Sequence, residues 1–134
     1  AMREASVTVT EDRILPDRDA EGKVTISLER LSKLPTAFAC NCDVTAYVLL
    51  NALKENGIRV PEDVSVVGFD DYILADLAVP SLTTYAIDVD HMAKVSAQQL
   101  IRRIQKPEAE VRRIVVSGKL VIRESVQKHS GNTA

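Results

Sequence analysis

Short apolar runs alternate along the chain with longer segments that have helical periodicity. The clearest run, 64–69 (VSVVGF), follows Pro61 and predicts a buried strand because it is apolar and rich in β-branched residues. Two shorter runs, 36–42 (TAFACNC) and 82–85 (LTTY), predict further strands, as does 7–9 (VTV) near the N-terminus. The strands are short and well separated, so the chain has room for helices between them.

A helix is expected at 44–56, directly after the strand at 36–42. Asp43 precedes it and is a good N-cap, because its carboxylate can accept from the first backbone amides. The helix ends at Asn56 and Gly57, a common C-terminal signal. Its residues are apolar almost all round, whereas packing on one sheet face needs only a stripe. We therefore expect it to contact a second surface as well.

Two more helices follow. Residues 71–78 predict a short helix that stops before Pro80, and Asp71 is expected to cap it. Residues 89–105 carry a clear helical stripe, with Asp88 or Asp90 as the cap.

The remaining segments give weaker patterns. Residues 114–122 (IVVSGKLVI) predict a hairpin with its turn at Ser117 and Gly118. Residues 24–34 are ambiguous and end in a helical turn, and the polar tail 128–134 is expected to be disordered.

Strands that are followed at once by helices predict an α/β fold with a parallel sheet flanked by helices. Ligands bind such sheets outside the carboxyl ends of the strands. Asp43 and the pair Asp70 and Asp71 fall at those ends. Because carboxylates are costly to bury, we expect them to line a cleft.

Composition and charge argue against a nucleic-acid-binding, membrane or secreted protein. The chain has 134 residues, enough for about one domain, and a net charge of −2, which gives no electrostatic footprint for nucleic acid. No apolar run approaches the roughly 18 residues of a membrane helix, and the N-terminus lacks the apolar core of a signal peptide. Cys40 and Cys42 are the only cysteines, and their thiols are expected to be reduced. The protein is therefore expected to be cytoplasmic, without membrane association.

The sequence offers no catalytic or metal centre. Cys40, Cys42, Asp43 and His91 do not fit a standard zinc spacing, and no serine or cysteine has the context of a nucleophile. We expect no enzyme activity, no metal and no cofactor.

A long motif in the middle of the chain resembles one family. Residues 57–71 (GIRVPEDVSVVGFDD), followed by LTT at 82–84 and SGKLVIRES at 117–125, are similar to the effector-binding core of the lac-repressor (LacI/GalR) regulators. The resemblance covers about 35–126. It implies a fold of the periplasmic-binding-protein-like type I, in which two subdomains hold the effector between them.

Within that fold, the resemblance places 1–127 as a truncated C-terminal subdomain with a crossover helix at 88–105. The helix-turn-helix and the first subdomain have no counterpart in the match. DNA binding is therefore expected only through a segment absent from this chain.

The resemblance also assigns site residues. Asp70, the first acid of GFDD, is implied to contact the effector, and Cys42 takes the place of an asparagine that often does so. A thiol is a poor substitute for a carboxamide. Asp43 matches the aspartate that follows this asparagine, and Arg13 or Ile14 falls near a position that is often aromatic.

Self-association is expected through two surfaces. The resemblance implies a dimer surface on the helices 44–56 and 71–78, formed by Tyr47, Leu50, Tyr72, Ile73 and Leu77. The crossover helix packs against the first subdomain in the family fold, so its stripe is expected to face water here. That stripe consists of Met92, Leu100, Ile101 and Ile104. A homodimer or higher oligomer follows.

The leading hypothesis is a non-catalytic domain that senses a small molecule, a sugar or similar metabolite, and dimerises. Two alternatives remain open. A receiver-like phosphotransfer domain also places acids at strand ends, and a transport-type sugar-binding module shares the fold.

Overall fold

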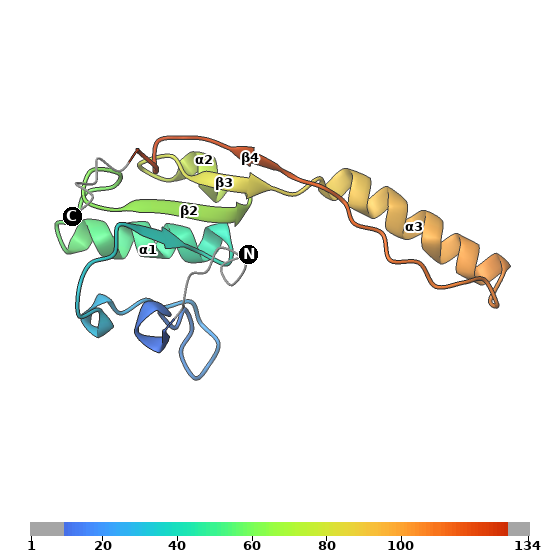
Figure 1. The fold of residues 1–134 in the computed structure, drawn as a ribbon, viewed down its shortest axis with the longest axis horizontal. Coiled ribbons are helices and arrows are strands. Elements are labelled where there is room, and N and C mark those ends of the chain that lie inside the picture. The colour runs from blue at the N-terminus through green and yellow to red at the C-terminus, as the bar shows by residue number, and fades with distance from the viewer. Residues whose placement is uncertain (1–9, 129–134) are drawn as a thin grey trace.

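The computed structural model describes residues 10–128, and its centre is a sheet (Figure 1). In this part of the chain the sheet has four strands in the order β1-β2-β3-β4. The strands are β1 (Ala37–Ala39), β2 (Ser65–Asp70), β3 (Thr83–Ala86) and β4 (Lys119–Val121). The first three are parallel and β4 is antiparallel to β3. The predicted α/β fold is confirmed, with an antiparallel edge strand added, as is common in such sheets. The strand expected at 7–9 and most of the tail lie outside the described residues.

Each expected helix forms, although the short one is shorter than predicted. The α-helices are α1 (Asp43–Glu55), α2 (Leu74–Leu77) and α3 (Val89–Gln105), and the 3₁₀ turns are η1 (Glu11–Arg13) and η2 (Leu28–Arg30). Turn η2 is the helical turn expected at the end of 24–34. Among the described residues, no helix is both long enough and apolar enough to cross a membrane.

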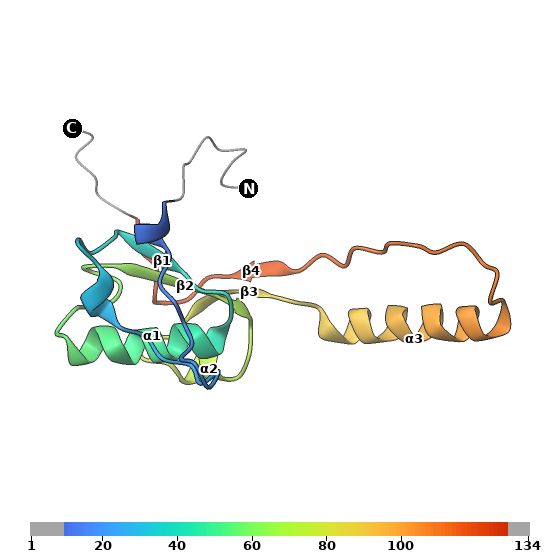
Figure 2. The same cartoon turned by 90° about the horizontal axis from the view of Figure 1, so that it is seen from below.

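Helices α1 and α2 cover the same face of the sheet (Figure 2). The buried residues of α1 recur every three or four positions, which turns one stripe of the helix toward β2. The core cluster comprises Ala46, Leu49, Leu50, Leu53, Val64, Val66, Ala75, Ala78 and Leu82. Burial of each large apolar side chain contributes about 1.5–3 kcal/mol, so this one-sided cluster is the main source of stability.

Leu50 is a correction to the expected dimer surface. Its side chain is 4% exposed and belongs to the core, because it lies on the buried stripe of α1. Tyr47 is half-buried, whereas Tyr72, Ile73 and Leu77 are 58%, 62% and 65% exposed.

Helix α3 projects away from the sheet in both views (Figures 1 and 2). Of the two caps left open, Asp88 and Asp90, the N-cap is Asp88: its side chain accepts from the backbone N–H of His91 at 2.9 Å. No residue of α3 is buried. The stripe expected to face water does so, with Leu100 and Ile104 at 63% and 70% exposure.

The hairpin expected at 114–122 is wrong. Residues 114–116 form no strand, and β4 pairs with β3 instead. The edge of β3 offers unpaired backbone groups, and the chain can reach it because Gly118 has no side chain. A Cβ there would collide with the carbonyl oxygen of Ala86 and the ring of Tyr85, while the Gly118 N–H donates to Tyr85 Oη at 3.0 Å. Gly118 therefore marks a close approach between strands and not a turn.

Candidate functional site

Two carboxylates gather at the carboxyl end of the sheet. Asp70 is the last residue of β2, and Asp43 is the first residue of α1, which follows β1. Burial, and after it the negative charge of Asp43, raises the pKa of Asp70 above its ordinary value. Asp70 is nevertheless exposed, so it can reach a solute.

The turn that carries Asp70 has an unusual backbone. Asp70 has φ +113° and Asp71 has φ +57°, and both lie in the left-handed region that residues with a Cβ rarely adopt. Each such residue costs on the order of 1–3 kcal/mol and persists only where its surroundings hold it in place. Residues of this kind cluster at functional sites, which makes this turn a candidate.

Asp43 does not cap its helix, so that prediction is wrong. Its Oδ2 accepts from the backbone N–H of Tyr72 at 2.7 Å, and its Oδ1 accepts from the hydroxyl of Thr84 at 2.6 Å. The N-cap position belongs to Cys42, which makes no side-chain capping bond. Asp43 is fully buried between helix and sheet, where donors from other elements satisfy it. Its burial also contradicts the expected direct contact with a ligand.

Asp71 does not cap α2 either. Its carboxylate accepts from the guanidinium of Arg123 at 2.8 Å, and the same guanidinium nitrogen lies 2.8 Å from Asp76. Helix α2 begins three residues later, at Leu74, too far along the chain for capping. Arg123 also donates to the carbonyl of Leu82 at 3.0 Å, so it ties the turn to β3.

A second group of polar residues lies beside the acids, and one of its members, Asp17, has no signal in the local sequence. Asp17 accepts from Asn41 Nδ2 at 2.9 Å and from Thr45 Oγ1 at 3.1 Å. The bond from Asn41 is the main cause that lowers the pKa of Asp17. Asp17 comes from a loop without periodicity, so only the fold reveals that it meets the strand end. The half-buried Cys42 joins the group through its sulfur, 3.4 Å from Thr45 Oγ1.

The Cys40 thiol is not set up for reactivity. Cys40 and Cys42 are both free, and burial raises the pKa of Cys40 to about 12. A thiol with so high a pKa is a poor nucleophile and metal ligand at neutral pH. In residues 10–128 no group of three or more His, Cys, Asp or Glu could hold a metal ion, and His91 lies exposed on α3.

Neither Arg13 nor Ile14, which fall near a position that is often aromatic in the family that the chain resembles, supplies an aromatic ring beside the acids. Both residues are exposed at η1, and no described hydrogen bond joins either side chain to the acids. An aromatic pair lies elsewhere: Phe69 and Tyr85, neighbours on β2 and β3, stack with centroids 5.5 Å apart at 17°. Phe69 directly precedes Asp70, so the pair borders the strained turn.

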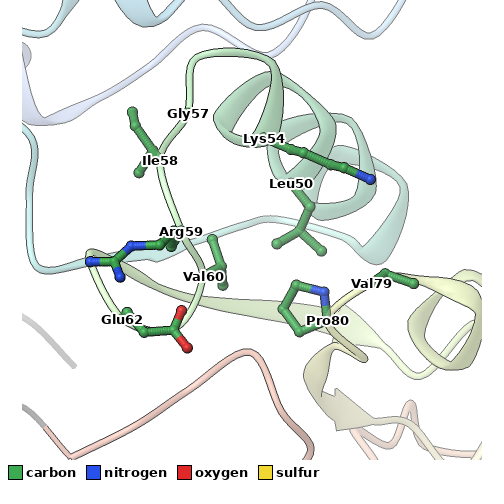
Figure 3. Close-up of a pocket in the computed structure, with 9 residues that line it drawn as sticks. All are labelled: Leu50, Lys54, Gly57, Ile58, Arg59, Val60, Glu62, Val79 and Pro80. Carbon is green, nitrogen blue, oxygen red and sulfur yellow. The ribbon is translucent and has the colours of Figure 1, made fainter.

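A pocket lies at the opposite end of the sheet (Figure 3). It has a volume of about 320 Å³ and lies where the chain enters β2 and β3, with Leu50 and Pro80 in its wall. The guanidinium of Arg59 is bonded to Asp63 at 2.7 Å and 3.0 Å, so it has little left for a ligand. We place the candidate site at the acids, because the strained backbone and the close carboxylates are there.

Comparisons with known proteins support the fold and identify the family. Residues 1–126 match the family described as periplasmic binding protein-like domain. The HTH-type transcriptional repressor PurR of Vibrio parahaemolyticus is 37% identical over 131 residues, covering 96% of this chain and 39% of that protein. The chain thus spans about two fifths of the length of this curated relative.

Solved structures give the same result. The transcriptional regulator CelR in complex with cellobiose is 35% identical, with a TM-score of 0.68 over 73% of this chain and 30% of that one. The lac repressor dimer bound to operator and the anti-inducer ONPF is 30% identical, with a TM-score of 0.64 over 70% of this chain and 32% of that one. The chain therefore belongs to the periplasmic binding protein-like domain family, and its relatives within that family are LacI-type transcriptional regulators.

Proposed function

We propose that this chain is the non-catalytic part of a LacI-type regulator that binds a small-molecule effector at the Asp70 turn. The observation that carries the proposal is the exposed Asp70 carboxylate, held at the end of β2 in a strained backbone conformation. A fixed carboxylate accepts hydrogen bonds from hydroxyl groups, and bonds to a charged acceptor are the stronger kind. Cys42 borders the same end of the sheet and is proposed as a weaker contact.

A sugar is the effector class that we favour. The similar regulator CelR was solved with cellobiose. Sugars present many hydroxyl donors, which suits an acceptor-only group such as Asp70. The protein is proposed to act in the cytoplasm, with DNA contact made through a helix-turn-helix such as the one in the name of PurR.

The two alternatives are less well supported. A receiver-like site would need Asp43 free for a metal or a phosphoryl group, yet both of its oxygens accept bonds from Tyr72 and Thr84. A transport module shares the fold, but the relatives that match most of this chain are transcriptional repressors.

Asp70→Asn should weaken sugar binding by about 1.5–3 kcal/mol, the range for a hydrogen bond to a charged group. Calorimetric titration with cellobiose, glucose and ribose measures this change. Stability should not fall. Because folding raises the pKa of Asp70, the folded state loses stability as the pH rises from the ordinary aspartate value through the raised pKa. A neutral residue removes this loss.

The matched control is Asp90→Asn, an exposed carboxylate on α3, which should leave affinity unchanged. Equal affinity of the Asp70→Asn variant and the parent would refute the role of Asp70. Absence of binding by the parent to every sugar tested would count against the effector class.

We also propose that the chain self-associates through two surfaces. The first combines Tyr47 with the exposed Tyr72, Ile73 and Leu77, and we call it the α1–α2 surface. The second is the exposed stripe of α3. The lac repressor, a similar protein, was solved as a dimer, which supports self-association of this fold.

Leu77→Glu should weaken the dimer without dissolving it, because a charge on the α1–α2 surface is costly to bury while α3 remains unchanged. Light scattering over a range of protein concentrations gives the mass. Val111→Glu is the control: Val111 is 80% exposed in the loop after α3, and its variant should associate like the parent. A parent that is monomeric at tens of micromolar contradicts the proposal.

A further inference from the structure

Asp43 joins three elements through one buried carboxylate. It starts α1 and is fully buried. One oxygen accepts from the Tyr72 N–H, in the segment between β2 and α2, and the other accepts from the Thr84 hydroxyl on β3. Because none of its surface is exposed, Asp43 cannot contact a ligand directly. Its role must be exerted through the groups that it holds.

One of those groups is the turn that carries Asp70. The positive φ angles of Asp70 and Asp71 make this turn unfavourable unless neighbouring groups stabilise it. Asp43 holds the backbone just after the turn at 2.7 Å, and Arg123 holds the Asp71 side chain at 2.8 Å. The remaining bond, from the Asp71 N–H to Thr84 Oγ1, is long at 3.4 Å. Asp43 is therefore a principal support of the turn.

The Asp43 carboxylate is also connected to the α1–α2 surface. Tyr72 donates its backbone N–H to Asp43 while its side chain is 58% exposed on that surface. Asp43 is also the first residue of the helix that carries Tyr47. A displacement of the turn would thus move one residue of the surface directly and pull on the start of α1.

We infer that Asp43 is a positioning residue that couples ligand binding at Asp70 to self-association at the α1–α2 surface. This inference rests on the proposed function. Coupling is reciprocal, so ligand and partner must change one another's affinity by the same factor. Asp43 supplies the physical connection because its two bonds fix the turn and Tyr72 together.

The test is the dimer dissociation constant, measured by sedimentation equilibrium with and without saturating sugar, using cellobiose, glucose and ribose as probes. In the parent chain the sugar that binds should change this constant by at least about fivefold, the lower end of usual coupling. In Asp43→Ala the dimer dissociation constant should no longer depend on the sugar, while both the variant and the parent remain folded. If Asp43→Ala does not fold, Asp43→Asn, which keeps the shape and loses the charge, replaces it in the same measurement.

Ser125→Ala is the matched control. Ser125 is as deeply buried as Asp43 and hydrogen-bonded to two strands, but it lies at the amino end of β2 and β3. Its loss should lower stability and leave the sugar-dependent change intact. If Ser125→Ala abolishes coupling as fully as Asp43→Ala, or if Asp43→Ala retains it, the inference is overturned.

A ligand-free readout separates this inference from the proposed function. In Asp43→Asn, the NMR-measured pKa of Asp70 should fall toward its ordinary value, because one of the two causes that raise it is removed. The amide resonance of Tyr72 should shift as its charged acceptor is lost. If no sugar binds the parent, the proposed function fails, and an unchanged Asp70 pKa with an unchanged Tyr72 amide overturns the role of Asp43 as well.

Discussion

Ser125→Ala should lower the free energy of unfolding by about 2–4 kcal/mol, because it removes two buried hydrogen bonds at once. The hydroxyl donates to the carbonyl of Val66 at 2.6 Å and accepts from the N–H of Thr83 at 2.8 Å. The backbone N–H of Val66 in turn donates to the carbonyl of Ser125 at 2.9 Å. Alanine would leave one buried donor and one buried acceptor without this partner. Urea unfolding should show a midpoint lower by about 1–2 M, given the usual dependence on denaturant for a small domain.

Ser65→Ala is the control for this prediction. The Ser65 hydroxyl accepts an exposed bond from the Gln127 N–H at 3.3 Å, so its loss should change stability by less than about 0.5 kcal/mol. Equal midpoints for the two variants would show that Ser125 does not join the strands in solution.

The fold could be predicted largely from the sequence because its elements are marked by local signals. The runs at β2 and β3 are rich in β-branched residues, and α3 begins at Asp88, one of its two predicted caps. The hairpin could not be predicted correctly, because the pairing of β4 with β3 joins segments on either side of α3. Nothing in the local pattern of 114–122 distinguishes a strand that pairs with its neighbour from one that pairs across such a distance.

The acids lie at the strand ends, as expected from the sequence, but Asp43 and Asp71 do not have the expected capping roles. Asp43 and Asp71 both precede the helices expected from the sequence, and the local sequence favours caps in such positions. Their actual partners, Thr84 and Arg123, lie 41 and 52 residues away along the chain. Asp17 could not be predicted for the same reason, since Asn41 and Thr45 reach it only in the folded protein. The local sequence indicates which acids lie at the strand ends, but tertiary contacts determine the hydrogen bonds and ion pairs that they form.

Gly68→Ala should lower the free energy of unfolding by about 3–5 kcal/mol, because the added methyl group has no space between α1 and the sheet. A Cβ on Gly68 would collide with Asp43 Oδ1 and lie 2.8 Å from Leu82 Cδ2. Overpacking of this kind costs about 1–3 kcal/mol. The displaced Asp43 carboxylate would also lose a charge-assisted bond, worth about 1.5–3 kcal/mol. Thermal and urea unfolding measure the loss.

Gly22→Ala separates this clash from the general effect of replacing a glycine. Gly22 has φ +82° and no atom within 4 Å of the position that a Cβ would take. Gly22→Ala should therefore lower the free energy of unfolding only by the cost of the left-handed backbone, about 1–2 kcal/mol. The double variant Gly68→Ala with Asp43→Ala tests the cause. Without the carboxylate the new methyl group has room beside α1, so the double variant should be less destabilised than the sum of the two single variants, by about 1–3 kcal/mol. Simple additivity would mean that the glycine of the GFDD motif is needed for some reason other than the space that Asp43 occupies. A clear coupling would explain the glycine of this motif physically: it leaves room for the carboxylate that supports the Asp70 turn.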